Sequence, residues 1–498
     1  MNWDFYKMVS LFTNSPQGRL LLNGNYGIEK ESQRVTFTGD LALTEHPAVF
    51  GNKSTNSRIT TDFSESQVEM ITPAFPTVEE AHQSLSAIQN EVETGIAGEF
   101  LWPLSMPPRL PEEKNIPIAK FDDSTLGREK EVYRKGLALR YGKKIQMISG
   151  IHYNFSFGSE LLDFLYLHFG KGQAKQNFIN DVYLAVTRNY LRYRWLLIYL
   201  FGASPQMDTT YYPVIRRDIK MIAKCCPEWC HVIEQYKQYA TSLRVSRFGY
   251  ADTRLEGYHG YFNNLAEYTR NIRKLLSTKS REYAKLGLYR NGNQIQLNDN
   301  VLQKESEFYA PIRLKHIAEL GETNLEALEK GGVQYLEVRI IDLDPYEKVS
   351  ISLQQLHFLQ IFMLFCLFET SRMISEKEMA AMEKNHQAVA LFGRKPNLQL
   401  IEYQREDIGL KKWAGEIFFR LRMIAQLVDQ VQSEDIYQAT IEAELQKIID
   451  ILLLPSARIQ RDIVANHENF LDFGIRQAMF HKSVHVANWE LQEAGNEH

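Results

Sequence analysis

The sequence lacks long hydrophobic runs, and this absence argues against a membrane-spanning protein. The longest apolar stretches are residues 195–203 and 358–368, the second interrupted by Gln360. Both are shorter than the ~18 consecutive apolar residues that a transmembrane helix needs, so they predict buried helices. The N-terminus also lacks the basic segment and long apolar run of a secretory signal. We therefore expect a cytoplasmic protein with no membrane partner.

Cysteine is scarce, with 4 residues in a chain of 498, which excludes a scaffold held together by disulfides. Cys225, Cys226 and Cys230 cluster, but they lack the C-x-x-C spacing and the fourth ligand that are typical of zinc sites. We interpret them as incidental helix or loop residues.

An excess of one charge is also missing, since 57 Lys and Arg residues face 61 Asp and Glu residues, for a net charge of −4. This balance argues against a nucleic-acid partner held by bulk charge, but not against a small anion such as a nucleotide. The sequence has no G-x-x-x-x-G-K-[ST] loop and no G-x-G-x-x-G after a strand. A P-loop ATPase, a Rossmann dehydrogenase and a protein kinase are therefore disfavoured.

Hydrophobic periodicity predicts strands scattered among helices, without a regular βαβ alternation. Strand patterns occupy residues 25–37, 57–73, 146–157 and 332–342. Helix patterns occupy residues 77–96, 126–141, 181–201, 261–276, 353–373, 412–432 and 442–454. This order favours an α+β fold around a mostly antiparallel sheet. With no linker or repeat in the sequence, we expect one catalytic domain over residues 1–498, in which residues 376–498 form a mainly helical C-terminal flank.

Charged residues recur at alternate positions of the predicted strands, where side chains share a face. These residues are Glu29 and Glu31 in the first strand, Glu65 and Glu69 in the second if it is regular, Asp62 just before them, and Glu337 with Arg339 in the fourth. They are either solvated faces of edge strands or a cluster that binds hard cations such as Mg²⁺. Nearby guanidinium groups would suit phosphate or carboxylate, and they belong to Arg134, Arg244, Arg313 and Arg339. Metal and arginine together suggest phosphoryl chemistry on a nucleotide.

Long segments of the sequence, in order along nearly the whole chain, resemble one known family. They include YGIEKESQRV, TDFSESQVEMITP, MISGIHYNFSF, TSLRVSRFGY and GGVQYLEVRIIDLDP. The sequence is similar to the glutamate–cysteine ligases (γ-glutamylcysteine synthetases) of the proteobacterial type, up to about residue 463. The resemblance implies a curved, mostly antiparallel sheet that forms a funnel, as in glutamine synthetase, in a monomeric enzyme.

The resemblance also implies a reaction, the first step of glutathione synthesis. ATP phosphorylates the γ-carboxyl group of L-glutamate, and the amino group of L-cysteine attacks the acyl phosphate to give γ-glutamylcysteine. Two or three Mg²⁺ ions assist. Three alternatives stay open: a γ-glutamyl ligase with another amine acceptor, a small-molecule kinase, and a catalytically inactive binding subunit.

Site residues follow from the same resemblance. The implied metal ligands are Glu29, Glu31, Asp62, Glu69, His152 and Glu337. Arg339 is expected to stabilise the transferring phosphate, and Arg244 to contact glutamate or its phosphorylated form. The implied substrate-binding residues are Phe63, Tyr133, Arg134, Gln146, Tyr250 and Tyr309. From its sequence context alone, His152 is more typical of a hydrogen-bonded core residue. For Tyr250, simple core packing remains open.

Overall fold

An antiparallel sheet organises the chain. The structure, a computed structural model, describes residues 3–496 except 97, 226–234, 250–261, 404 and 434. In these residues, seven strands pair in the order β2-β3-β1-β5-β9-β8, with β4 also paired to β1. Every pairing is antiparallel, which confirms the expected fold class. The strands are β1 (Gly24–Val35), β2 (Ile59–Thr61), β3 (Gln67–Ile71), β4 (Phe100–Leu101), β5 (Ile151–Phe157), β8 (Ile312–Lys315) and β9 (Tyr335–Ile341).

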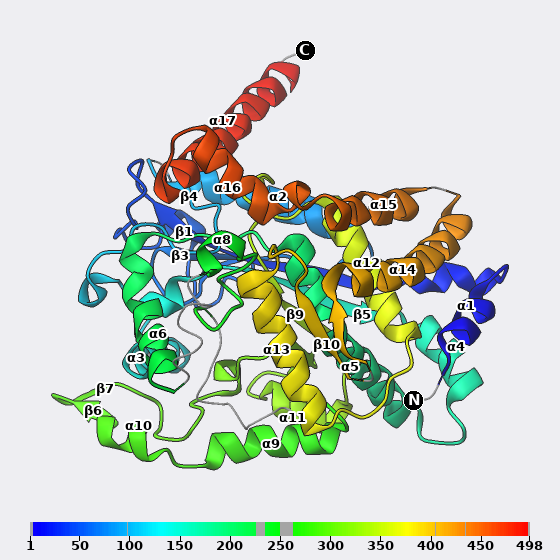
Figure 1. Cartoon of the computed structure of the whole chain (residues 1–498). Helices are drawn as coiled ribbons and strands as arrows, with labels where there is room; N and C mark the ends of the chain where they lie inside the picture. Colours follow the sequence, from blue (N-terminus) through cyan, green and yellow to red (C-terminus); the bar gives the residue numbers. More distant parts are fainter. Residues whose placement is uncertain are drawn as a thin grey trace.

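Helices surround the sheet (Figure 1). Before β9 they are α1 (Phe5–Phe12), α2 (Val78–Gly95), α3 (Thr125–Tyr141), α4 (Ser159–Phe169), α5 (Lys175–Phe201), α6 (Tyr212–Cys225), α8 (Tyr236–Tyr239), α9 (Leu265–Ser277), α10 (Arg281–Leu286) and α11 (Asn324–Gly331). After it come α12 (Leu353–Phe368), α13 (Glu376–Phe392), α14 (Leu410–Gln432), α15 (Ile436–Ile449), α16 (Pro455–Ala465) and α17 (Phe470–Asn496). Each predicted helix is present with shifted ends. None of the described helices combines the length and apolarity needed to span a bilayer.

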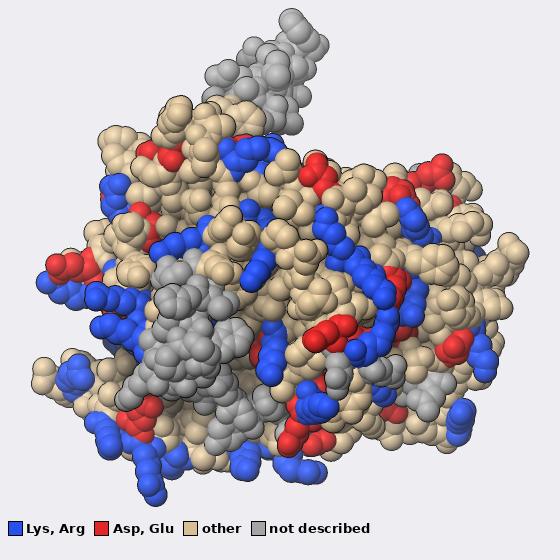
Figure 2. Space-filling model, in the orientation of Figure 1, with Lys and Arg blue, Asp and Glu red and all other residues tan. Residues whose placement is uncertain are grey.

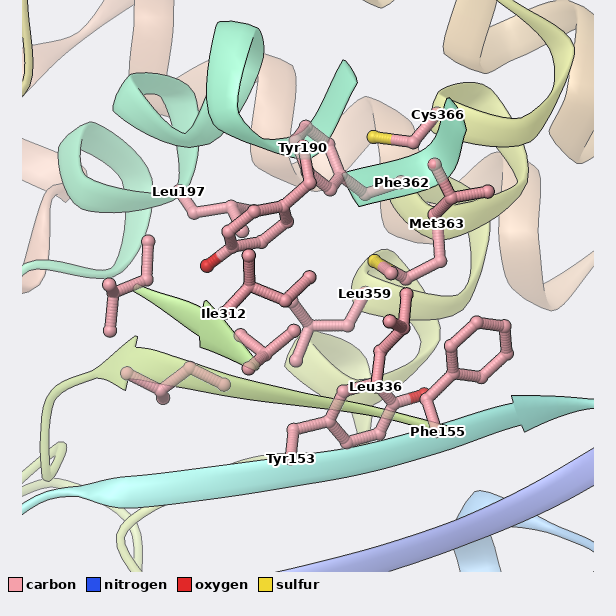
Figure 3. Packing of buried hydrophobic residues seen from close by; sticks show 14 of the residues in the cluster. Tyr153, Phe155, Tyr190, Leu197, Ile312, Leu336, Leu359, Phe362, Met363 and Cys366 are labelled. Carbon is pink, nitrogen blue, oxygen red and sulfur yellow. The ribbon is translucent and has the colours of Figure 1, made fainter. Parts of the chain in front are cut away.

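One face of the sheet packs on α5 and α12 to form the core (Figure 3). Tyr153 and Phe155 of β5 and Leu336 of β9 point toward Leu359 and Phe362 of α12. All five are buried, and each large apolar side chain buried in this way contributes roughly 1.5–3 kcal/mol. Because side chains alternate along a strand, the residues between them project from the opposite face.

One prediction about strands needs correction. The segment 57–73 is not one regular strand, because β2 and β3 form a hairpin whose turn covers residues 62–66. The described part of the segment 376–498 is mainly helical, and it also contains a second hairpin, formed by β10 (Gln399–Glu402) and β11 (Glu406–Gly409). A third hairpin joins β6 (Tyr289–Arg290) to β7 (Asn293–Gln294). Short, mainly polar turns close these hairpins. The sequence of each hairpin therefore shows no strong strand periodicity.

Acidic and basic side chains are interspersed on the face of the molecule that Figure 2 shows. The residues of the predicted cation site are not part of such an exposed surface. Glu31, His152 and Glu337 are buried on the sheet. A solvated edge-strand face is therefore the wrong interpretation of these acids. Cys226 and Cys230 lie outside the described residues.

Candidate active site

Strand register brings the predicted acids together on the sheet face opposite the core. Glu29 of β1 pairs with His152 of β5, and Glu31 pairs with Glu69 of β3. On the other side of β5, Asn154 pairs with Glu337 of β9. The β5–β9 register shifts between Ile151 and Tyr153, where two steps along β5 face three along β9, so β9 bulges opposite His152. The two-residue spacing predicted that acids within one strand share a face. The pairing register shows which acids of neighbouring strands lie side by side.

This face is the floor of a cavity of about 310 Å³. Eleven of the predicted site residues line it: Glu29, Glu31, Asp62, Glu69, Tyr133, Gln146, His152, Arg244, Tyr309, Glu337 and Arg339. Phe63 and Arg134 do not line the cavity. Tyr250 lies outside the described residues.

Glu29, His152 and Glu337 form the tightest cluster in the cavity. His152 Nδ1 lies 2.9 Å from Glu29 Oε2 and 3.7 Å from Glu337 Oε1. Burial and the Arg339 charge lower the pKa of His152, so its imidazole is neutral near pH 7, as a metal ligand must be. Burial opposes ionisation of Glu29, but the hydrogen bond from His152 keeps the pKa of Glu29 below its usual value.

In a second group of acids, the cations among the described residues do not fully offset the negative charge that ionisation would create. Burial and the neighbouring Asp62 carboxylate raise the pKa of Glu31 to about 8. Burial and the carboxylates of Asp62, Glu29 and Glu31 raise the pKa of Glu69 well above its usual value. A raised pKa means that the deprotonated cluster is electrostatically unfavourable without positive charge. A bound cation would supply that charge.

The donor set fits hard cations. Ligand atoms of Glu29, His152 and Glu337 all lie within 4.8 Å of one another, which one cation can span. Asn154 adds an amide whose Nδ2 donates to Glu29 Oε1 at 2.8 Å, whereas its buried Oδ1 has no hydrogen-bond partner among the described residues. Carboxylate and amide oxygens are the ligands that Mg²⁺ prefers.

Cationic side chains border the same floor on the β8–β9 side. Lys315 Nζ lies 3.0 Å from Glu337 Oε2, and the Arg339 guanidinium contacts the other oxygen of Glu337. Burial opposes ionisation of Glu337, but Arg339, Lys315 and Arg313 hold its pKa well below the usual range. The Nε atoms of Arg313 and Arg339 are buried and have no hydrogen-bond partner within the described part of the chain. Free guanidinium donors beside a carboxylate cluster suit an oxyanion.

Arg244 enters the cavity from the segment that follows α8. Its side chain is only 2% exposed, and its Nη2 donates to the backbone oxygen of Arg339 at 2.9 Å. Its Nε and Nη1 are buried and have no hydrogen-bond partner among the described residues. Because a buried unpaired donor is costly, these N–H groups mark a place for a bound anion.

The predicted substrate-binding residues divide into two groups. Tyr133, Gln146 and Tyr309 line the cavity, and the Tyr133 hydroxyl accepts from Ser306 Oγ at 3.1 Å. Phe63 is buried in a separate hydrophobic cluster. Arg134 donates to the backbone oxygens of residues 61 and 62, so it holds the loop that carries the cavity residue Asp62.

Glu65 does not point into the cavity, because it lies in the β2–β3 turn instead of a regular strand. Its Oε2 accepts from the His46 backbone N–H at 2.9 Å, and its Oε1 accepts from the Lys120 backbone N–H and from Lys53 Nζ, both at 2.5 Å. Glu65 thus joins three segments of the chain beside the site. These contacts give Glu65 a structural role, whereas the family resemblance had implied no role for it.

Sequence reasoning missed three features in and around the cavity. These are the strand β8 with Lys315, the amide of Asn154, and the acid–phenol pair Glu307 and Tyr141, whose Oη donates to Glu307 Oε1 at 2.7 Å. The alternation of Arg313 and Lys315 in IRLK is a signal for β8, although a four-residue strand is too short to distinguish from a loop.

Comparisons with known proteins show the family of this chain. The family model of glutamate–cysteine ligase matches residues 9–389. A glutamate–cysteine ligase of Clostridium acetobutylicum is 52% identical over 479 residues, covering 96% of this chain and 100% of the relative. One of Pseudomonas putida (KT2440) is 39% identical, covering 95% and 87%. The crystal structure of a glutamate–cysteine ligase from Francisella tularensis in complex with AMP has a TM-score of 0.82 at 32% identity, covering 93% of this chain and 89% of that one.

Proposed function

The chain belongs to the glutamate–cysteine ligase family, and from this premise we propose that its cavity catalyses the ATP-dependent formation of γ-glutamylcysteine. The γ-carboxylate of L-glutamate attacks the γ-phosphorus of ATP, and ADP leaves. The amino nitrogen of L-cysteine then attacks the acyl carbon, phosphate leaves, and the nitrogen loses a proton. The products are γ-glutamylcysteine, ADP and phosphate.

The observation that carries this proposal is the meeting of two kinds of side chain in one buried cavity. Carboxylates on β1, β3 and β9 face guanidinium N–H groups of Arg244 and Arg339 that have no hydrogen-bond partner in the part of the chain that the structure describes. Phosphoryl transfer between two anions requires both: ligands for cations, and donors for the transferring group.

In this proposal the acids of the cavity floor hold Mg²⁺, two or three ions in all. The ligands are Glu29, Glu31, Asp62, Glu69, His152 and Glu337. When bound, Mg²⁺ would supply positive charge that offsets the repulsion between ATP phosphates and the substrate carboxylate. Asn154 orients Glu29 by donating a hydrogen bond from its amide N–H, as residues that hydrogen-bond to metal ligands commonly do.

Arg339 and Arg244 act on the reacting anions. Arg339 is fixed by Glu337 and presents its free Nε to the transferring phosphoryl group. Arg244 presents Nε and Nη1 to the γ-carboxyl group and then to the acyl phosphate. Both donors are already in place before the reaction, so little reorganisation accompanies the transfer of charge.

Tyr133, Tyr309 and Gln146 form the wall that receives L-cysteine. Two aromatic rings beside an amide suit a small side chain that ends in sulfur, since sulfur packs well against ring edges. The same wall holds the cysteine amino group near the acyl phosphate.

The test is an acceptor screen with ATP, Mg²⁺ and L-glutamate, in which ADP is measured and products are identified by mass spectrometry. We expect ADP release that depends on both L-glutamate and L-cysteine, and a product with the mass of γ-glutamylcysteine. Equal ADP release without cysteine would indicate a kinase instead of a ligase. A faster reaction with a different amine would reassign the acceptor.

A further inference from the structure

A buried polar network lies behind Arg244, outside the cavity lining. At its centre is Asp342, which follows the last residue of β9. Asp342 Oδ2 accepts from the backbone N–H of Ala203 at 2.9 Å and from the Ser204 hydroxyl at 2.7 Å, while Oδ1 accepts from the Ser242 hydroxyl at 3.0 Å. These three hydrogen bonds fix the position of the carboxyl group.

The same carboxyl group forms an ion pair with Arg244. Arg244 Nη1 lies 3.7 Å from Asp342 Oδ1, and the two side chains are 2% and 0% exposed. This separation is too long for a hydrogen bond, so the attraction orients the guanidinium group without occupying its N–H donors. Burial raises the pKa of Asp342, whereas Arg244 and the three hydrogen-bond donors oppose the rise.

Gly150 provides a second constraint on the guanidinium group. A Cβ atom on Gly150 would lie 1.9 Å from Arg244 Nη2 and 2.2 Å from Cζ, so only glycine leaves room for Arg244 in this position. The N–H of Gly150 also donates to Glu31 Oε2 at 3.1 Å. Arg244 is therefore packed against the backbone that carries the proposed metal ligands.

We propose that Asp342 is a positioning residue, which holds the guanidinium group of Arg244 so that Nε and Nη1 point to the γ-carboxyl group of L-glutamate. Asp342 does not line the cavity and acts through Arg244. The naming of L-glutamate as the anion rests on the proposed function. The positioning itself rests on the contacts of Asp342, Ser204, Ser242 and Gly150.

A double-mutant cycle in the full-length enzyme tests the proposal. We expect Asp342→Asn to raise the KM for L-glutamate by about 10- to 100-fold, because a displaced guanidinium group loses its alignment with the substrate. The KM for L-cysteine should change by less than about 2-fold. In an Arg244→Ala background the same substitution should change the KM for L-glutamate by less than about 2-fold. Equal effects in the two backgrounds would overturn the proposal.

Two further variants separate positioning from folding. Asp344→Asn is the matched control, because Asp344 is two residues further along and accepts from the Tyr346 backbone N–H without contacting Arg244. It should leave the KM for L-glutamate within about 2-fold of wild type. Ser242→Ala removes one donor to Asp342 and is the milder variant if Asp342→Asn does not fold. We expect it to raise that KM about 3-fold, and an unchanged KM would contradict the proposal.

Crystal structures of the wild type and Asp342→Asn (or Ser242→Ala) measure positioning without any activity. We expect the Arg244 guanidinium group to shift or lose order in the variant. An unmoved group overturns the inference, even in an active ligase. If the wild type releases no ADP with glutamate and cysteine, the proposed function fails, but the structural comparison still decides the role of Asp342.

Discussion

Replacing Glu337 with glutamine removes one buried charge from the centre of the site and preserves the size of the side chain. The Glu337 side chain is 3% exposed and contacts Lys315 at 3.0 Å as well as Arg339. His152 Nδ1 lies 3.7 Å from it. The variant therefore leaves two partly buried cations, Lys315 and Arg339, without this counter-charge and removes one proposed ligand.

The structure sets the magnitude of two effects. With an effective dielectric constant of about 20, Coulomb's law gives about 5.5 kcal/mol for a pair of charges 3.0 Å apart, as Lys315 and Glu337 are. Relaxation reduces this figure, and loss of one partner of a buried pair typically costs about 3–5 kcal/mol of stability. For turnover we expect a decrease of at least ~100-fold, which corresponds to about 2.7 kcal/mol in activation free energy.

The assay is steady-state ADP release over a titration of Mg²⁺, accompanied by urea unfolding of the metal-free protein. Glu337→Gln should raise the Mg²⁺ concentration for half-maximal rate by at least ~10-fold. Glu93→Gln is the matched control: Glu93 is 5% exposed and belongs to α2, and its Oε1 accepts from Gln89 Nε2 at 2.7 Å, outside the cavity lining. The control should retain its Mg²⁺ dependence.

A turnover of Glu337→Gln within about 3-fold of wild type, with an unchanged Mg²⁺ requirement, would refute the assignment of Glu337 to the cation site. An equal loss of turnover in Glu93→Gln would show that the loss comes from a general disturbance of the sheet.

Three other predictions concern residues around the site. Tyr309→Ala should raise the KM for L-cysteine at least ~10-fold and that for L-glutamate less than ~2-fold in initial-rate measurements, and equal rises would place Tyr309 outside the cysteine wall. Glu65→Gln should lower the free energy of unfolding in urea by about 1–3 kcal/mol, because it weakens the bonds to Lys53 and two backbone N–H groups; unchanged stability with altered KM values would contradict this structural role. Burial lowers the pKa of His386 to about 4. Between about pH 6.5 and 4 the unfolded state therefore binds a proton that the folded state does not, and the free energy of unfolding should fall on acidification by up to ~1.4 kcal/mol per pH unit. His386→Gln should flatten this slope, and an unchanged slope would assign it to other groups.

Local rules predicted the parts of the fold that depend on local sequence. Thr77 was expected to open a helix, and it is the N-cap of α2, where its side chain accepts from the Glu80 backbone N–H. Glu29 and Glu31 share a face because strand side chains alternate every second residue. Neither result needs knowledge of a distant segment.

Non-local features were beyond the reach of these rules. A continuous strand pattern over residues 57–73 proved to be a hairpin, because Glu65 hydrogen-bonds to segments near His46 and Lys120. The edge strand β8 forms only because β9 offers it a partner, and this pairing places Lys315 beside Glu337. Pairing partners far apart in the chain leave no local periodicity to detect.

The sequence by itself determined the family, the antiparallel α+β fold and the identity of most side chains in the cavity. It could not determine which of those side chains point inward, since a turn, a bulge or a register shift reverses the face of every residue that follows. The tertiary structure directed Glu65 away from the cavity and placed a bulge of β9 opposite His152. It also positioned Asp342 behind Arg244, although 97 residues separate them in the chain by their numbering. The physical reason is that charge in a buried site acts through distance and desolvation, and both are set only when the strands pair.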